Sequence, residues 1–378
     1  MPVSEEAAQI FDATDRRFMA AAIRLSRRHL GLTGENPSVG ALIVRPDADG
    51  GPMIVGRGVT ALGGRPHAEL QALAEAGELA RGATAYVTLE PCSHIGRAPP
   101  CADALVAAGV ARVVVAVLDP DIRVAGRGVS ILRGAAIEVA AGCEEKAARQ
   151  AMEGFLSLKG RGRPFLTLKL AVSADARIGR SGAGQVAITG PVARQAAQIM
   201  RAAHEAIMVG VGTVIEDDPL LTVRLDGLQD RSPMRIVVDP FARTPPDARM
   251  LGERAAGSVM ILASEKAPRS AVEALRDRGA SVQALSSDYR GRFDPREIMR
   301  FLGVTGLKSV LLEGGADTAR RFIEAQLVDR IALFTSRAVI GEGGIASPVT
   351  LDSVPDHYGK GRSSVLGEDE LIEFERRV

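Results

Sequence analysis

Four residues that could bind a metal and move a proton fall in two short stretches of this 378-residue chain. HAEL, residues 67–70, supplies His67 and Glu69, and TLEPCSHIGRAPPC, residues 88–101, supplies Cys92 and Cys101. One imidazole and two thiolates are the ligand set of a catalytic zinc ion that keeps its fourth position for water. In zinc deaminases a glutamate that is not a ligand takes a proton from that water and passes it to the leaving nitrogen, and Glu69 fits this role.

The start of a helix is expected to position the first pair. Pro66 suits a helix opening, so His67 and Glu69 are predicted in the first turn, near the positive end of the helix dipole. Side chains two residues apart on an ideal helix point to nearly opposite sides. Glu69 therefore has to fold back toward the helix start to share a site with His67.

The cysteines are also expected beside helix starts. Cys92 follows a predicted strand at 83–90, and Cys101 follows APP at the head of a predicted helix, where a thiolate is favoured. A structural zinc ion would prefer four protein ligands, but the remaining Cys143 is distant in the sequence and is interpreted as a buried bystander. His94 is an alternative ligand, although its place two residues after Cys92 favours a substrate contact.

Composition argues against a protein that binds nucleic acid or a membrane. The 47 basic and 46 acidic side chains nearly cancel, so no overall field attracts nucleic acid or a membrane surface. Aromatic residues make up 3% and tryptophan is absent, which removes stacking platforms for single-stranded nucleic acid. The first residues lack the features of an export signal, no apolar run approaches a membrane span, and three cysteines make no disulfide framework. We expect a cytoplasmic protein that acts on small molecules.

The pattern of hydrophobic residues predicts two α/β domains. A helix is expected at 15–30 and a hairpin at 39–59, followed by a helix at 67–77, a strand at 83–90, a helix at 101–109 and a strand at 111–119. A charged helix at 143–160 leads into the linker RGRP. We therefore expect one domain at 1–160 and a second at 161–378, each a sheet covered by helices.

The second half contains one candidate phosphate site. In SVLLEGGADTARRFIEAQ, residues 309–326, an apolar strand runs into two glycines and then a helix, which suits a phosphate but is also a common structural connection. GRGVTA at 56–61 and GAGQVA at 182–187 match a loose dinucleotide pattern, but neither lies between a strand and a helix. VGVGTVIEDDPLLTVR, residues 209–224, is expected to contain a second glycine-containing turn, followed by Asp217, Asp218 and Arg224. The alternative is a surface turn with a solvated pair of charges.

The first half resembles a known family. NPSVGALIV, HAELQAL, TLEPCSHIGRAPPCADAL and DPDIRVAGRG resemble the deaminase half of bifunctional riboflavin-biosynthesis proteins. The long spacing from Cys92 to Cys101 differs from the PCxxC of cytidine and tRNA adenosine deaminases. The resemblance implies a cytidine-deaminase-like, three-layer α/β/α domain. It further implies zinc on His67, Cys92 and Cys101, proton transfer by Glu69, and a substrate pocket that includes Asn36.

The second half resembles the reductase half of the same family, through LKLAVSADARIG, ITGPVAR, VGVGTVIEDDPLLTVR, RIVVDP and LLEGGADTARRFI. This implies a dihydrofolate-reductase-like α/β domain that uses NADPH. The implied NADPH contacts are Ala171, Thr213, Asp217, Gly315, Ala316, Asp317, Thr318, Ala319, Arg320 and Arg321. The implied substrate contacts are Gly184, Arg201, Leu221, Arg224 and Glu313. A tryptophan common in the family is replaced near Val186 and Ala187, which removes a flat wall against the nicotinamide.

The resemblance implies two consecutive reactions on a pyrimidine ribose phosphate. The 2-amino group of 2,5-diamino-6-ribosylamino-4(3H)-pyrimidinone 5′-phosphate is hydrolysed, and the ribosyl group is then reduced to ribityl with NADPH. Asp217 and Asp175 both stay open as the acid of the reduction. A homo-oligomer, dimer or tetramer, is expected. Two alternatives are a nucleic-acid-editing deaminase with an accessory domain and a nucleotide sensor whose zinc only staples the fold.

Overall fold

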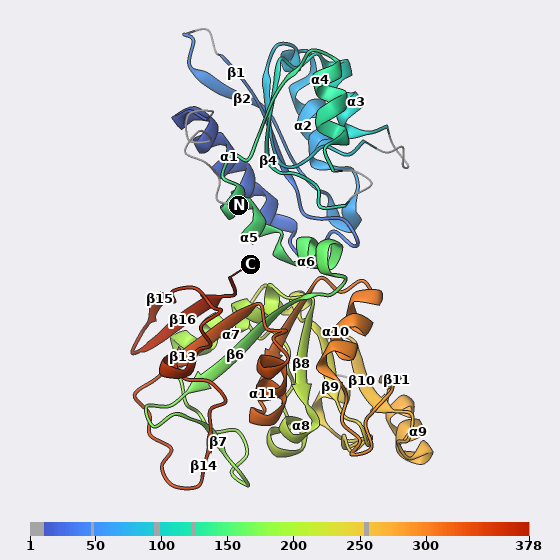
Figure 1. Cartoon of the computed structure of the whole chain (residues 1–378), viewed down its shortest axis with the longest axis vertical. Coiled ribbons are helices and arrows are strands. Elements are labelled where there is room, and N and C mark those ends of the chain that lie inside the picture. The colour runs from blue at the N-terminus through green and yellow to red at the C-terminus, as the bar shows by residue number, and fades with distance from the viewer. Residues whose placement is uncertain (1–10, 47–48, 94–98, 122–124, 253–256, 378) are drawn as a thin grey trace. The chain divides into compact units, whose positions relative to one another are not determined.

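The chain folds into two compact units, Met1–Arg161 and Gly162–Val378. The computed structural model (Figure 1) describes residues 11–46, 49–93, 99–121, 125–252 and 257–377. Each unit has its own buried hydrophobic core. No helix within the described ranges is long and apolar enough to cross a bilayer.

Unit 1 is built on a five-stranded sheet in the order β2-β1-β3-β4-β5. Its strands are β1 (Gly40–Pro46), β2 (Pro52–Val59), β3 (Thr84–Leu89), β4 (Arg112–Val117) and β5 (Glu138–Ala141). The predicted hairpin is confirmed, because β1 and β2 pair antiparallel. Strands β3, β4 and β5 are parallel, so the segments that follow β3 and β4 emerge at the same edge of the sheet.

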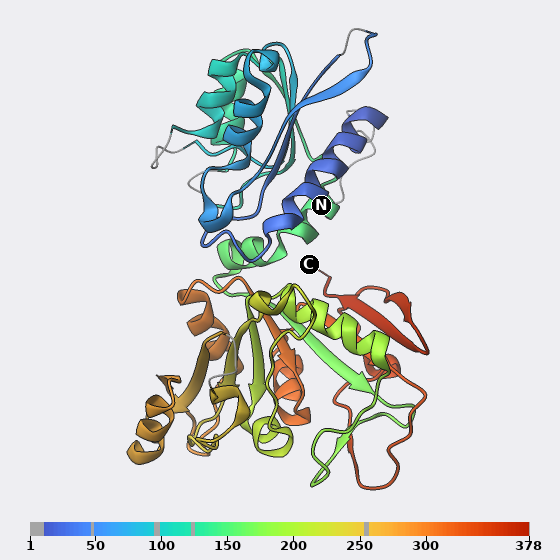
Figure 2. The same cartoon turned by 180° about the vertical axis from the view of Figure 1, so that it is seen from behind.

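Helices cover both faces of this sheet and confirm the three-layer architecture (Figures 1 and 2). One layer is α1 (Ala13–Ser26) with α5 (Glu145–Ala151), and the other is α2 (Ala68–Ala76), α3 (Cys101–Ala108) and α4 (Arg127–Gly134). Helix α2 lies very close to β2, since a Cβ atom at Gly58 would be 1.9 Å from the carbonyl oxygen of Ala68. The glycines of GRGVTA thus serve helix packing.

The charged segment at 143–160 forms two helices where one was predicted. Helix α5 ends at Ala151, its C-cap Met152 has a non-helical φ of −128°, and α6 (Glu153–Arg161) begins directly after Met152. Short 3₁₀ turns occur in both units, at Arg27–His29, Leu62–Gly64, Gly77–Ala80, Gln229–Arg231, Arg249–Leu251 and Leu351–Ser353.

Unit 2 contains a nine-stranded sheet in the order β11-β10-β9-β8-β12-β6-β13-β16-β15. Strands β16 and β15 are antiparallel to their neighbours and the others are parallel. The strands are β6 (Phe165–Val172), β8 (Ala206–Gly210), β9 (Met234–Val238), β10 (Val259–Ser264), β11 (Ser281–Leu285), β12 (Ser309–Glu313), β13 (Arg330–Thr335), β15 (Arg362–Leu366) and β16 (Asp369–Glu375). A separate antiparallel pair joins β7 (Arg177–Arg180) to β14 (Gly344–Ala346).

The central strands of unit 2 are buried on both faces. In β8, Ile207 and Val209 belong to one core and Met208 belongs to the other, as the two-residue period of a strand requires. The helices are α7 (Pro191–Ala202), α8 (Val211–Asp217), α9 (Arg269–Asp277), α10 (Pro295–Val304) and α11 (Ala316–Glu324). The turn predicted within 209–224 is wrong, since α8 forms there and buries Val211 and Val214 against the core.

Candidate functional site

His67, Cys92 and Cys101 bring their donor atoms together, all within 4.8 Å of one another. The Nδ1 atom of His67 lies 3.6 Å from Sγ of Cys92 and 3.4 Å from Sγ of Cys101. Two donor atoms on a tetrahedral zinc ion lie about 3.5–3.8 Å apart, because the bonds are about 2.0–2.3 Å long. The arrangement therefore has the dimensions of a zinc site with three protein ligands.

The local backbone explains how these residues meet. His67 is the N-cap of α2, with an extended backbone at φ −68° and ψ 161°, so the prediction that it lies in the first helical turn is wrong. The chain turns between His67 and Glu69, which removes the expected conflict of side-chain directions. Cys101 is the first residue of α3, and its backbone N–H donates to Sγ of Cys92 at 3.3 Å.

The charges of the cluster favour a divalent cation. A hydrogen bond from the Cys101 thiol, together with His67 and the Cys101 backbone, lowers the pKa of Cys92 to about 4. The pKa of Cys101 is raised far above its ordinary value, chiefly because its thiol donates to Cys92. Without a metal only one sulfur ionises readily. A zinc ion would supply the positive charge that lets both become thiolates.

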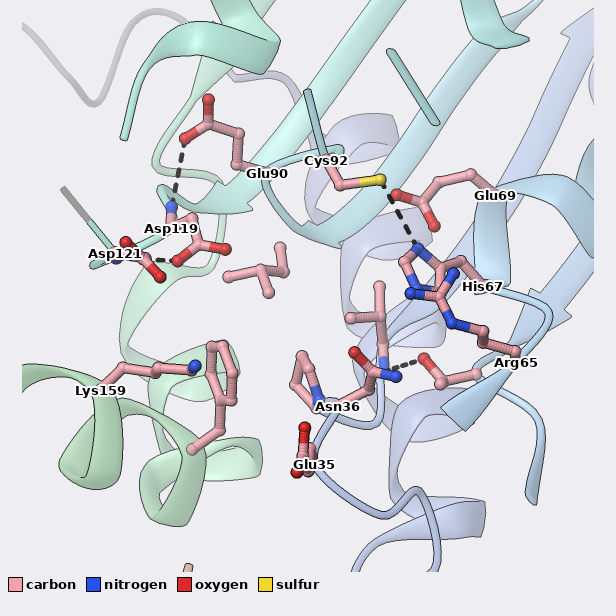
Figure 3. Close-up of a pocket in the computed structure, with 15 residues that line it drawn as sticks. Glu35, Asn36, Arg65, His67, Glu69, Glu90, Cys92, Asp119, Asp121 and Lys159 are labelled. Atoms are coloured by element: carbon pink, nitrogen blue, oxygen red, sulfur yellow. Dashed lines mark hydrogen bonds between the residues drawn. The ribbon is translucent and has the colours of Figure 1, made fainter. Parts of the chain in front are cut away.

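Glu69 has the environment of a proton carrier. It lies in the first turn of α2, its side chain is buried, and Figure 3 shows it beside Cys92 and His67. Burial is the main cause that raises the pKa of Glu69 to about 7. A carboxyl group poised near neutral pH can both accept and donate a proton.

The cluster opens into a pocket of about 200 Å³ (Figure 3). Ionisable and polar side chains line most of it: Glu35, Asn36, Arg65, His67, Glu69, Glu90, Asp119, Asp121 and Lys159. The side-chain amide of Asn36 donates to the carbonyl oxygen of Gly64 at 3.2 Å, which fixes its orientation at the pocket wall. His94 lies outside the described residues. Lysine and arginine facing carboxylates suit a substrate that is both charged and rich in hydrogen-bonding groups.

Unit 2 holds a glycine-lined cradle where β8 and β12 end side by side. Gly314 and Gly315 both have positive φ, at 69° and 67°, and a Cβ atom on either would be 3.3 Å from Oγ1 of Thr213. A Cβ atom on Gly210 would be 2.5 Å from Oγ1 of Thr318. The structure thus brings Thr213 and Thr318 to the start of α11, where backbone N–H groups and the helix dipole suit a phosphate.

A buried group of charges adjoins this cradle. The guanidinium group of Arg201 donates to both carboxylate oxygens of Glu313, each at 2.8 Å, and to the carbonyl oxygen of Thr222 at 3.3 Å. Lys169 lies opposite Glu313 in the register of β6 and β12, and burial lowers the pKa of Lys169. Sequence reasoning missed Lys169, although a lysine within the apolar run LTLKLAV is a signal for a special role.

The remaining predicted residues differ in their accessibility. Ala319 and Leu221 are buried in the hydrophobic cores, so their side chains pack within the protein. Five others are exposed or partly exposed: Ala171, Gly184, Arg224, Asp317 and Arg320. Arg321 donates to the carbonyl oxygen of Phe293. Ala316 begins α11 and lies directly after the glycine pair.

Asp217 and Asp175 have opposite electrostatic environments. Burial raises the pKa of Asp217, which ends α8. The hydroxyl group of Ser173 and the backbone N–H groups of Ile340 and Gly341 donate to Asp175 and lower its pKa to about 2. Asp175 is therefore ionised at neutral pH, and its hydrogen bonds join its own loop to the backbone at Ile340 and Gly341.

Two family profiles match successive parts of the chain. Residues 12–117 match the cytidine and deoxycytidylate deaminase zinc-binding region, and residues 164–356 match the RibD C-terminal domain. The first match contains all three residues of the metal cluster. The second contains the glycine cradle and the charged group beside it.

Whole proteins are similar over nearly the full length. The riboflavin biosynthesis protein RibD of Aquifex aeolicus is 37% identical over 96% of this chain and 98% of its own. RibD of Escherichia coli is 39% identical over 86% of this chain and 89% of its own. Two solved structures have the same fold. One is Acinetobacter baumannii RibD, with a TM-score of 0.80 and 34% identity over 98% of this chain and 100% of its own. The other is a diaminohydroxyphosphoribosylaminopyrimidine deaminase/5-amino-6-(5-phosphoribosylamino)uracil reductase from Thermotoga maritima, with a TM-score of 0.81 and 31% identity over 96% of this chain and 98% of its own.

Proposed function

The chain belongs to the RibD family of bifunctional riboflavin-biosynthesis proteins, and from that membership we propose which residues carry each of its two reactions. It is a zinc-dependent deaminase and an NADPH-dependent reductase. The nucleic-acid-editing and sensor alternatives are not favoured. We assign the deaminase to residues 1–160 and the reductase to 161–378, and the two profile matches, at 12–117 and 164–356, support this division.

For the deamination we assign His67, Cys92 and Cys101 as zinc ligands and Glu69 as the proton carrier. Bound zinc would acidify and orient a water molecule at the position that the protein leaves open. A carboxylate oxygen of Glu69 takes one proton from the water and delivers it to the pyrimidine ring nitrogen as the water oxygen bonds to the ring carbon. Glu69 then passes the second proton of the water to the amino group, whose bond to that carbon breaks, so that ammonia leaves and a carbonyl group remains. Asn36 orients the ring at the pocket wall, and His94 is assigned to the substrate as well. The observation that carries this proposal is the buried Glu69 beside three converging donor atoms.

For the reduction we assign NADPH to the cradle formed by Thr213, Thr318 and the glycines before α11. NADPH supplies the hydride. The other proposed contacts are Ala171, Asp217, Ala316, Asp317, Ala319, Arg320 and Arg321, where the buried Ala319 can offer only its backbone. Because Asp175 is held ionised, Asp217 is the better proton donor of these two acids.

The substrate of the reduction is assigned to the surface next to the buried charged group. Gly184, Leu221, Arg224, Arg201 and Glu313 are the proposed contacts. The guanidinium group of Arg201 already donates two hydrogen bonds to the carboxylate of Glu313, so Arg201 orients that carboxylate. The exposed guanidinium group of Arg224 is the better match for the ribose phosphate.

The partners of the protein are small molecules, and no nucleic acid or membrane is expected to bind. We propose a cytoplasmic location, because a reducing compartment keeps cysteine side chains free of disulfides. We also propose a homo-oligomer, dimer or tetramer, which light scattering of the purified protein would test.

One experiment tests both halves. The purified protein is mixed with the diaminopyrimidine ribose phosphate, with and without NADPH, while ammonia release and NADPH oxidation are followed separately. Ammonia release in both mixtures and NADPH oxidation only after deamination are expected. Absence of ammonia release would contradict the deaminase assignment.

A further inference from the structure

Glu90 joins the turn that leads to Cys92 to the opposite wall of the pocket. It follows β3 and lies two residues before Cys92, and its side chain is 3% exposed. Among the described residues, four backbone N–H groups donate hydrogen bonds to its carboxylate, those of Asp119, Gly126, Gly128 and Val129. The role of this glutamate is not explained by zinc binding or by proton transfer.

The four bonds divide evenly between the two oxygens. Oε2 accepts from the N–H groups of Asp119 and Gly126 at 3.2 and 3.0 Å. Oε1 accepts from those of Gly128 and Val129 at 2.9 and 3.3 Å. Such a set requires two acceptor oxygens, so the position needs a carboxylate.

Three of these donors belong to the start of α4. Gly126 is the N-cap of this helix and has no side chain to cap it. The first N–H groups of a helix have no partner within it, and a negative charge there is favoured by the helix dipole. Glu90 therefore caps α4 from a distant strand and fixes where the helix begins.

Close packing at the same point leaves little freedom. A Cβ atom on Gly128 would lie 2.0 Å from the carbonyl oxygen of Pro91 and 3.3 Å from Cγ of Glu90. The backbone at Gly128 thus rests directly on the turn that leads to Cys92. Any movement of α4 at its start is transmitted to this turn.

The fourth bond fixes the backbone at Asp119, which lines the pocket. Asp119 and Asp121 line the pocket, and the Asp121 N–H group donates to Oδ1 of Asp119 at 2.9 Å (Figure 3). Glu90 holds the backbone of Asp119 directly. The carboxylates of this loop therefore keep their position relative to Cys92 through Glu90.

We propose that Glu90 is a positioning residue of the deaminase: by capping α4 and holding Asp119, it sets the distance between the metal side and the Asp119–Asp121 side of the pocket. This inference rests on the deaminase function of unit 1. It predicts that loss of the carboxylate weakens substrate binding while the metal site and the proton carrier stay intact.

The test compares Glu90→Gln with the parent full-length protein. Glutamine has the same shape but presents an NH₂ group to two N–H donors, which displaces the loop. KM for the diaminopyrimidine phosphate is expected to rise about tenfold, which corresponds to about 1.4 kcal/mol of substrate binding, with kcat little changed. Zinc content and the reductase activity of the same chain should equal those of the parent. Glu78→Gln, an exposed carboxylate outside the pocket, is the matched control.

A double-mutant cycle separates positioning from general stabilisation. If Glu90 acts through Asp119, then Glu90→Gln adds little to the rise in KM caused by Asp119→Asn. Fully additive effects, or a KM of Glu90→Gln equal to that of the parent, would overturn the proposal. Glu90→Asp, which keeps the charge and shortens its reach, gives the same measurement if the glutamine variant does not fold. Ammonia release by the parent tests the deaminase function separately.

Discussion

Arg201 and Glu313 form a buried, bidentate ion pair that links α7 to the end of β12. Both bonds are 2.8 Å long, and the two side chains are 12% and 9% exposed. Burial opposes ionisation of Glu313, but the charges of Arg201 and Lys169 prevail and lower its pKa to about 2. The carboxylate is therefore ionised at neutral pH and depends on its cations.

Removal of one partner should destabilise unit 2. Arg201→Met removes the ion-pair partner of Glu313, and loss of one partner of a buried pair costs about 3–5 kcal/mol. Amide hydrogen exchange in β12 would measure the change in opening free energy. Arg269→Met is the control, because its pair with Glu273 is 93% and 54% exposed, and about 1 kcal/mol at most is expected. Equal changes in opening free energy for the two variants would show that the buried pair stabilises unit 2 no more than an exposed pair does.

The metal cluster could be predicted from the sequence because its residues lie near element ends that local patterns reveal. The spacing from His67 to Cys101 and the prolines near both cysteines indicate that the three residues form one metal site. The backbone at His67 was not predicted, since a pattern of residue types does not separate an N-cap from a first helical turn. The structure shows an extended N-cap there.

Features that depend on distant contacts were missed. Lys169 meets Glu313 only because β6 and β12 are neighbours in the sheet. Helix α4 was not predicted, since its cap comes from Glu90 and not from its own sequence. Helix α8 contains Gly212, a weak helix former, and burial of its valines overrides that preference.

NADPH binding should require that residue 315 has no side chain. Gly315→Ala places a Cβ atom 3.3 Å from Oγ1 of Thr213, so we expect a higher KM for NADPH and an unchanged deaminase. Gly306→Ala is the control, because Gly306 also has a positive φ, of 86°, but nothing within 4 Å of its Cβ position. Steady-state kinetics with NADPH as the varied substrate would measure both. A similar KM for the two variants would attribute the effect to backbone strain alone.

Unit 2 should lose stability in mild acid because of His204. Its Nδ1 donates to the carbonyl oxygen of Met200, and burial lowers its pKa to about 4, from 6.5 when unfolded. The unfolded chain therefore binds more protons between these values, and stability is lost as pH falls from about 6.5 to about 4, by up to about 3 kcal/mol. Hydrogen exchange across this range should show a smaller loss for His204→Gln. An equal slope in the variant would exclude His204 as the cause.

Loss of the metal should abolish the deaminase activity and leave the reductase activity unchanged. Cys101→Ala removes a proposed ligand, so zinc content and ammonia release should fall together while the reductase still oxidises NADPH with deaminated substrate. Cys143→Ala is the matched control, since Cys143 is a buried thiol whose pKa is raised to about 12 by burial. Elemental analysis and the two assays would measure this. Equal zinc loss in both variants would contradict the ligand assignment.

The rate of ammonia release by zinc-loaded Glu69→Gln tests the central claim most directly. The variant keeps the shape of the side chain and all three metal ligands but cannot carry the proton. We expect one zinc ion per chain, an unchanged reductase, and a loss of deamination of about 10²–10⁴-fold, the usual contribution of a general acid–base group. Ammonia release at the parent rate would contradict the assignment of Glu69 as the proton carrier.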